Sequence, residues 1–238
     1  MAKTCDGDAR KALSVLETAV IAATEADQDA IHINAESMKM AVGRRAVQYD
    51  PTGDEHYDCA SALIKSIRGS DPDAGLYWLA RMIEGGEDIR FICRRLIILA
   101  SEDIGNADPH ALPLSMACSQ ACEQIGLPEC QLTLSQTVTY LACAPKSNAA
   151  TTAIGAARRD VREDRILPVP RHLRDAHYDA AEELGNGVDY QYSHNEADGV
   201  SAQEYLGVEK EYYQPVDRGF EAELRQRLIG IRKKISGD

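Results

Sequence analysis

Apolar residues recur with the period of an α-helix along most of this chain. Near the N-terminus they follow the i, i+3, i+4, i+7 spacing, at Ala9, Ala12, Leu13, Leu16, Ala19, Val20 and Ala23. Polar residues such as Arg10 and Glu17 occupy the opposite face, and Asp6 or Asp8 can cap the free amides at its start. We therefore expect an amphipathic helix over residues 9–23 with one buried side.

A second helix is expected to begin at Asn34, whose side chain can cap the first free amides. Pro51 and Gly53 then interrupt the periodic pattern within the stretch YDPTGDEHYD. We place a domain boundary at this break, which divides the chain into residues 1–48 and residues 49–238.

Six more helices are expected after the boundary, because apolar stretches alternate with turn residues there. The expected ranges are 55–68, 72–84, 88–103, 109–124, 128–143 and 147–161. The helix over 72–84 has the clearest ends, with Pro72 in its first turn, a capping box formed by Ser70 and Asp73, and Gly85 and Gly86 after it. Short connections favour antiparallel neighbours, so we predict an all-α helical bundle.

The last third of the chain has a different pattern. Residues 163–214 contain prolines, glycines and six tyrosines, and a helical period is found only over 175–184. Tyrosines can bury their rings while the hydroxyl stays in water, so we expect a long irregular tail that wraps over the bundle. Only VDYQYSH (188–194) alternates like a strand, which would allow a short β-hairpin. A final helix is expected over 217–234.

Composition narrows the class of protein. No apolar run approaches the roughly 18 residues that a membrane span needs, and the N-terminus lacks the apolar core of a signal peptide, so we expect a cytoplasmic protein without membrane contact. Seven cysteines without any Cys-x-x-Cys pair are typical of reduced thiols in a core. The net charge of −12 disfavours contact with phosphate backbones unless a local basic patch overrides it.

The sequence lacks several common catalytic motifs. No Gly-x-x-x-x-Gly-Lys-Ser/Thr loop is present, and Asp54-Glu55 does not end an apolar strand as a Walker B acid would. There is no Gly-x-Ser-x-Gly elbow, and the six histidines show no zinc-site spacing. We therefore expect no P-loop hydrolysis of ATP and no catalytic residue in this chain.

Two clusters suggest metal ligands, and each has a simpler explanation. Asp54, Glu55, His56 and Asp58 form one cluster that could hold a divalent ion, but acids in the first turn of a helix are also favoured by its dipole. Cys118 and Cys122 form the other, at i, i+4 on a face that also carries apolar residues. We interpret both clusters as structural and predict no metal.

Two further sets of charged residues remain open to interpretation. The stretch RRLIILASED places Arg94, Arg95, Glu102 and Asp103 on a largely apolar helix, as an internal ion-pair network or as a contact between subunits. Arg10 stands in the first turn of its helix, where a guanidinium can reach a γ-phosphate and report its hydrolysis. The helix by itself favours a surface arginine instead.

Several strings together resemble one family, the replication-associated recombination protein A family (RarA, also called MgsA), whose eukaryotic relative is the Werner-helicase-interacting AAA+ ATPase. The strings are GDARKAL (7–13), YDPTGDEHYDCASALIKSIRGSDPDAGLYWLARMIEGGED (49–88), ASEDIGNADP (100–109), APKSNAA (144–150), LPVPRHLR (167–174) and YYQPVDRGFE (212–221). Together they extend over nearly the whole chain. The stretches 171–187 and 199–207 depart from the family pattern, so we transfer no partner site to the tail.

The resemblance implies that the chain corresponds to the C-terminal half of such a protein. Residues 1–48 would be the remainder of the AAA+ lid, and residues 49–238 a helical domain that assembles the protein into a homotetramer. GDAR is similar to the family's sensor-2 motif, so Arg10 would contact ATP, with its magnesium, held by an ATPase domain of the whole protein. No cofactor is expected to bind this chain alone.

For the whole protein, the resemblance implies ATP and DNA binding, clamp-loader-like ATPase activity, and action at stalled forks and DNA ends together with the single-stranded-DNA-binding protein. A nucleoid-associated place in the cytoplasm would follow. The alternative from the residues themselves is a DNA- or protein-binding adaptor. It would use the arginines of two helices, Arg94, Arg95, Arg158, Arg159 and Arg162.

Overall fold

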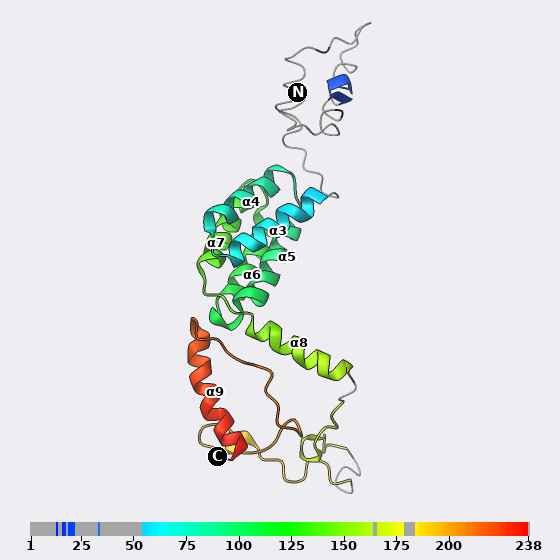
Figure 1. Ribbon diagram of the computed structural model, residues 1–238, viewed down its shortest axis with the longest axis vertical. Helices are drawn as coiled ribbons and strands as arrows, with labels where there is room; N and C mark the ends of the chain where they lie inside the picture. The colour runs from blue at the N-terminus through cyan, green and yellow to red at the C-terminus, as the bar shows by residue number, and fades with distance from the viewer. Residues whose placement is uncertain are drawn as a thin grey trace. The chain divides into compact units, whose positions relative to one another are not determined.

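The described part of the chain is helical, as the sequence pattern predicts. The structure is a computed structural model that describes residues 13, 16, 17, 19–21, 33, 54–163, 166–178 and 184–237. Throughout these residues the regular elements are helices and no strand is present (Figure 1). The all-α prediction is confirmed. Among the described residues, no helix is long and apolar enough to cross a membrane.

The chain divides into two compact units. The first unit contains Met1–Leu96 and Cys118–Ala142, and the second contains Ile97–Ala117 and Cys143–Asp238. The division passes through α5 (Ile89–Leu99) and α6 (Ala111–Ile125), and it separates the last residue of α7 (Cys130–Cys143) from the rest of that helix.

The first unit is a bundle of helices. It is built from α3 (Asp54–Arg68), α4 (Pro72–Glu84), α7 (Cys130–Cys143) and the adjoining parts of α5 and α6. Its core residues include Leu63, Ile67, Met82, Ile92, Leu134 and Leu141, all of them almost completely buried. At Gly75 an added Cβ would lie 3.0 Å from Val138 and 3.5 Å from Ile67. α4 therefore packs closely on both α3 and α7 at this glycine.

The start of α4 differs from the predicted capping box. Asp71, not Ser70, is the N-cap residue, and its Oδ1 accepts a hydrogen bond of 2.9 Å from the amide of Ala74. Ser70 has a positive φ of 64° and belongs to the turn that closes α3. Pro72 stands in the first turn, as predicted.

The predicted helix over 88–103 is not continuous. Its α-helical part ends at Leu99, and the chain continues as a π-helix over Ala100–Ile104 and a 3-10 helix over Gly105–Ala107. Within the second unit, the carbonyl of Asp103 accepts a hydrogen bond of 2.8 Å from the amide of Ser147. The wider turn thus serves a long-range contact that helical periodicity does not encode.

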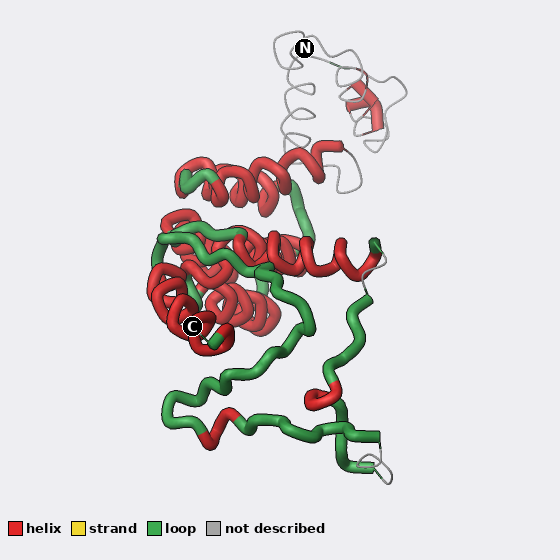
Figure 2. The backbone as a smooth tube through the Cα atoms, turned by 60° about the horizontal axis from the view of Figure 1, so that its bottom comes forward, coloured by secondary structure: helices red, strands yellow, loops and turns green. Residues whose placement is uncertain are grey.

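The second unit carries two longer helices joined by the irregular tail. α8 runs over Ala149–Arg162 and α9 over Phe220–Ser236. Figure 2 shows the described parts between them as loop, apart from two 3-10 helices, Arg171–Leu173 and Ser193–Asn195. The irregular tail is therefore as predicted.

The strand suggested by VDYQYSH is wrong. Asp189 has a positive φ of 64°, and a 3-10 helix begins at Ser193. The amide of Gln191 donates to the Oε1 of Gln203 at 3.1 Å, so a side chain takes the place of a neighbouring strand. The short helix predicted over 175–184 is also wrong for 175–178, which are not helical, and its next five residues lie outside the described part.

The N-terminal helix is described at only a few positions. Leu13, Leu16, Glu17 and residues 19–21 are helical, in agreement with the pattern over 9–23. Ala19 is buried as predicted, whereas Leu13 on the same predicted face is 68% exposed. Arg10, Asn34 and the capping aspartates lie outside the described residues.

Candidate functional site

Three cysteine side chains from two helices converge in the first unit. Cys93 comes from α5, and Cys118 and Cys122 come from successive turns of α6. Their sulfur atoms all lie within 4.8 Å of one another, with 4.0 Å between the sulfurs of Cys118 and Cys122. We call these three residues the thiol cluster. Across the described ranges, no other three histidine, cysteine, aspartate or glutamate side chains come together in this way.

Helix α7 covers the thiol cluster. The Cys118 sulfur lies 3.7 Å from the carbonyl oxygen of Thr133, and the Cys122 sulfur lies 3.9 Å from that of Cys130. None of the three cluster residues is more than 5% exposed, and Cys130 is fully buried. The cluster therefore lies in a water-poor interior lined by soft sulfur atoms and backbone carbonyls.

Burial and mutual hydrogen bonding give the three thiols different pKa values. The hydrogen bond from Cys93 lowers the pKa of Cys118 from 9.0 to about 6. Because Cys93 donates that bond and is itself buried, its own pKa is raised. Burial also raises the pKa of Cys122, to about 12. The arrangement is that of one thiolate-prone sulfur beside two thiols that keep their protons.

The sequence identified part of this cluster. The i, i+4 spacing placed Cys118 and Cys122 on one apolar face, and their burial is confirmed. Cys93 was missed as a partner because it comes from a different helix. One signal was available, since Cys93 lies among buried Ile92 and Leu96 and so belongs to the core side of α5.

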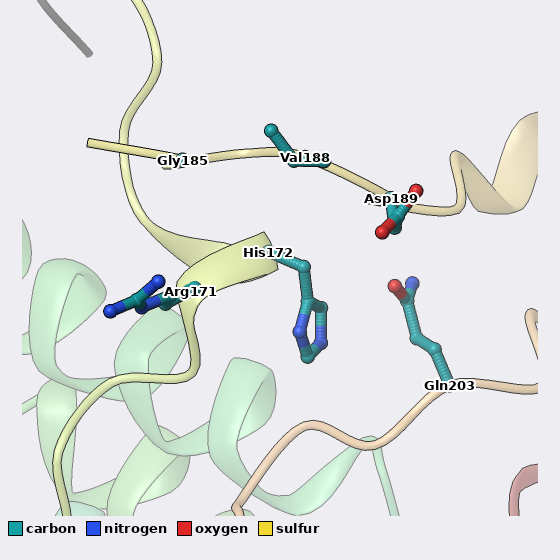
Figure 3. Close-up of a pocket in the computed structure, with 6 residues that line it drawn as sticks. All are labelled: Arg171, His172, Gly185, Val188, Asp189 and Gln203. Carbon is teal, nitrogen blue, oxygen red and sulfur yellow. The ribbon is translucent and has the colours of Figure 1, made fainter. Parts of the chain in front are cut away.

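The tail of the second unit forms an open pocket of about 450 Å³. Its lining residues are Arg171, His172, Gly185, Val188, Asp189 and Gln203 (Figure 3). Figure 3 shows the side chains of Asp189 and Gln203 pointing toward one another, whereas Arg171 extends away from them.

Hydrogen bonds to other parts of the tail hold the polar groups of this pocket. Nε2 of His172 lies 2.8 Å from the carbonyl oxygen of Glu204, and Nε2 of Gln203 donates to the carbonyl of Gln191 at 2.8 Å. The six lining residues include no hydroxyl or thiol nucleophile. This chemistry suits loop ordering or weak polar binding better than covalent catalysis.

Of the acidic cluster at the start of α3, the structure describes the side chains of His56 and Asp58. His56 is buried, and its Nδ1 pairs with the carboxylate of Glu87, while its ring packs 4.4 Å from that of Phe91. Asp58 is exposed on the same helix. The side chains of Asp54 and Glu55 lie outside the described part. His56 thus serves the packing of the first unit.

The arginines singled out by the sequence belong to two different units. Arg94 of α5 is exposed and stacks over the ring of Phe91, at 5.5 Å from its centroid. Arg158, Arg159 and Arg162 are exposed on the last turns of α8, in the second unit.

Comparison with known families shows which family this chain belongs to. The family described as MgsA AAA+ ATPase C terminal matches residues 69–232, and the family described as AAA C-terminal domain matches residues 1–68. The chain belongs to the MgsA AAA+ ATPase C-terminal family. The resemblance drawn from the sequence is confirmed.

The relatives of this MgsA C-terminal chain include proteins whose names refer to replication. It is 51% identical to an uncharacterized AAA domain-containing protein of Mycobacterium tuberculosis over 96% of the chain and 51% of that protein. It is 45% identical to replication-associated recombination protein A of Bacillus subtilis over 97% of the chain and 55% of that protein. The ATPase WRNIP1 of Dictyostelium discoideum is 39% identical over 82% of the chain and 24% of its own length. The chain spans about half the length of the first two relatives.

The MgsA C-terminal match contains both sites described above. Residues 69–232 include the whole thiol cluster, the tail pocket and most of α9. The other match, over residues 1–68, includes the predicted position of Arg10 and all of α3.

Proposed function

We propose that this chain is the homotetramerisation module of an AAA+ ATPase that acts in replication-associated recombination. The family match and the names of the relatives from Bacillus subtilis and Escherichia coli support the part of this proposal that concerns replication-associated recombination. In the whole protein, the module would hold several ATPase domains in a fixed arrangement, while ATP, magnesium and DNA ends or forks bind mainly elsewhere.

The observation that carries this proposal is an exposed apolar stripe on α8. Ile154 is 59% exposed and Val161 is 60% exposed. They stand seven residues apart, so they share one face of the helix, with the small side chain of Ala157 between them. Large apolar side chains gathered on one face mark a surface that association buries.

Other apolar side chains of the second unit are also exposed. Ile229 on α9 is about half exposed, and Ile166 and Val169 in the tail are more exposed still. A second copy of the chain carries the same surface, and closed symmetric assemblies reuse one patch on every subunit. Self-association is therefore the simplest way to cover these residues.

The solution mass of the 238-residue chain tests the proposal. We expect light scattering after size exclusion to give four times the chain mass of 26.0 kDa over a wide concentration range. The double variant Ile154→Asp/Val161→Asp should lower that mass, because it puts charge into the apolar stripe that the tetramer would bury. Arg159→Asp, on the opposite face of α8, is the matched control and should leave the mass unchanged. A wild-type monomer at all concentrations would contradict the proposal.

We further propose that Arg10 is the sensor-2 arginine of this ATPase, which contacts ATP held by its ATPase domain. The sequence GDAR supports this role, and the AAA C-terminal match includes the position. A contact between a guanidinium and the γ-phosphate would couple hydrolysis to movement of the helix that carries it.

A further inference from the structure

We propose that the thiol cluster of Cys93, Cys118 and Cys122 is a binding site for one thiophilic metal ion with a filled d shell, such as Zn²⁺ or Cu⁺. The ion would lie inside the first unit and join α5 to α6. This role is additional to assembly and ATP hydrolysis, and it does not depend on either.

Geometry is the first support for this site. A metal bound to thiolates at about 2.3 Å in tetrahedral geometry separates its sulfur ligands by about 3.8 Å. The sulfurs of Cys118 and Cys122 lie 4.0 Å apart, and Cys93 completes a group within 4.8 Å. Small rotations of the side chains would therefore bring all three sulfurs to bonding distance of one ion.

The type of donor selects the type of ion. All three donors are sulfurs, and they are buried at 5% exposure or less. Thiolates favour Zn²⁺ and Cu⁺, whereas Mg²⁺ and Ca²⁺ require oxygen ligands. Three sulfurs alone suit three-coordinate Cu⁺, and Zn²⁺ would add a fourth donor.

Proton release is part of the chemistry of binding, because each cysteine binds a metal ion as its thiolate. Binding forms three metal–sulfur bonds and releases up to three protons to solvent, with no change in the oxidation state of metal or sulfur. Affinity should therefore rise with pH, as the cost of removing these protons falls.

The test is a metal titration of the 238-residue chain during refolding. The chain is unfolded and refolded with a phosphine reductant in the presence of Zn²⁺ or, without oxygen, Cu⁺, so that burial does not block entry of the ion. Metal retained after desalting is then counted. We expect one equivalent of Zn²⁺ or Cu⁺, no retained Mg²⁺, and a higher melting temperature for the loaded chain. Co²⁺ should give a sulfur-to-metal charge-transfer band.

Single variants locate the site. Cys93→Ser, Cys118→Ser and Cys122→Ser should each weaken binding by more than the roughly 10–100-fold that loss of an outer-shell partner costs. Cys143→Ser is the matched control, because Cys143 is an exposed thiol outside the cluster. The corresponding Cys→Ala variants, checked for helix content by circular dichroism, separate loss of a ligand from loss of the fold.

Two results would overturn the proposal. One is a wild-type chain that refolds and retains neither Zn²⁺ nor Cu⁺. The other is retention that is lost in Cys143→Ser, or that persists undiminished in all three folded cluster variants. Either outcome would leave the cluster as three thiols that fill the core.

Discussion

The sulfur of Cys118 lies beside two other sulfurs in a place that water does not reach, and its acidity follows from that position. Cys93 donates to it, and this bond outweighs the burial that would otherwise favour the neutral thiol. The i, i+4 spacing could predict that Cys118 is buried. It could not predict the hydrogen bond from Cys93, because Cys93 comes from another helix. The apolar pattern of one helix does not show which other helix packs against it.

The acidity of Cys118 predicts how stability changes with pH. Its pKa is lowered from 9.0 to about 6 by folding, so between these values the unfolded chain binds the extra proton and stability rises with pH. Above pH 9 the raised pKa values of Cys93 and Cys122 reverse the trend, because the folded state keeps their protons. Urea midpoints measured with a chelator from pH 6 to 9 should show the rise in the wild type and not in Cys118→Ala.

Arg10 is the residue whose role depends most on the whole ATPase. If its guanidinium contacts ATP, Arg10→Ala in the full-length protein should reduce turnover by about tenfold or more, as loss of an interaction made to the transferring phosphate does. Lys11→Ala, the neighbouring basic residue, is the matched control. Unchanged turnover and unchanged ATP affinity in Arg10→Ala would show that the sensor-2 assignment is wrong.

The start of α9 is determined by a contact with residues that are far away in the sequence. Gly219 is the N-cap residue with a φ of +53°, and a Cβ there would lie 2.1 Å from the carbonyl oxygen of Ala107 and 2.7 Å from Pro145. Periodicity predicted a helix from 217. The observed start at Phe220 is three residues later, because the backbone at Gly219 must first pass close to Ala107.

Gly219→Ala should therefore destabilise the chain. Strain from the positive φ and the close contact with the Ala107 backbone together suggest a loss of about 3 kcal/mol in the free energy of unfolding. Gly230→Ala is the control on the same helix, since nothing lies within 4 Å of its added Cβ, and it should stabilise by about 0.5–1 kcal/mol. Urea denaturation followed by circular dichroism compares the two. Equal effects from both variants would contradict the contact.

The elements that sequence reasoning missed share one cause. The helices of the first unit were predicted to within a few residues, because their apolar faces repeat with the helical period. The π-helix after Leu99 and the absence of a strand near Gln191 both depend on distant partners, Ser147 and Gln203. Local pattern cannot show such partners. The tail pocket was missed for the same reason, since its lining residues come from separate stretches.

The net charge of the whole chain disfavours direct binding of DNA. The net charge is −12, although α8 exposes Arg158, Arg159 and Arg162 near its end. We expect the 238-residue chain alone to bind duplex DNA no more tightly than the non-specific range of about 10⁻⁴–10⁻⁶ M. Fluorescence anisotropy at several salt concentrations measures this.

Tight binding with a steep dependence on salt would favour the adaptor alternative instead. In that case Arg158→Ala/Arg162→Ala should flatten the salt dependence, because each phosphate contact contributes about one unit to the slope. Lys233→Ala/Lys234→Ala on α9 removes the same amount of charge elsewhere and is the matched control.

The contacts at the start of α9 also indicate whether the second unit needs a continuous chain to stay folded. Gly219 lies against Ala107 and Pro145, and both of these residues come before the tail. The hydroxyl of Tyr213 donates to Glu221 and accepts from Asn106, so the end of the tail is held from the same side. These contacts attach the start of α9 to residues before the tail, and Lys234 near the end of α9 pairs with Glu196 and Asp198 in the middle of the tail. A chain that is cut in the middle of the tail should therefore stay together as two pieces. Two fragments that are made separately, one ending and one beginning at that cut, should reassemble.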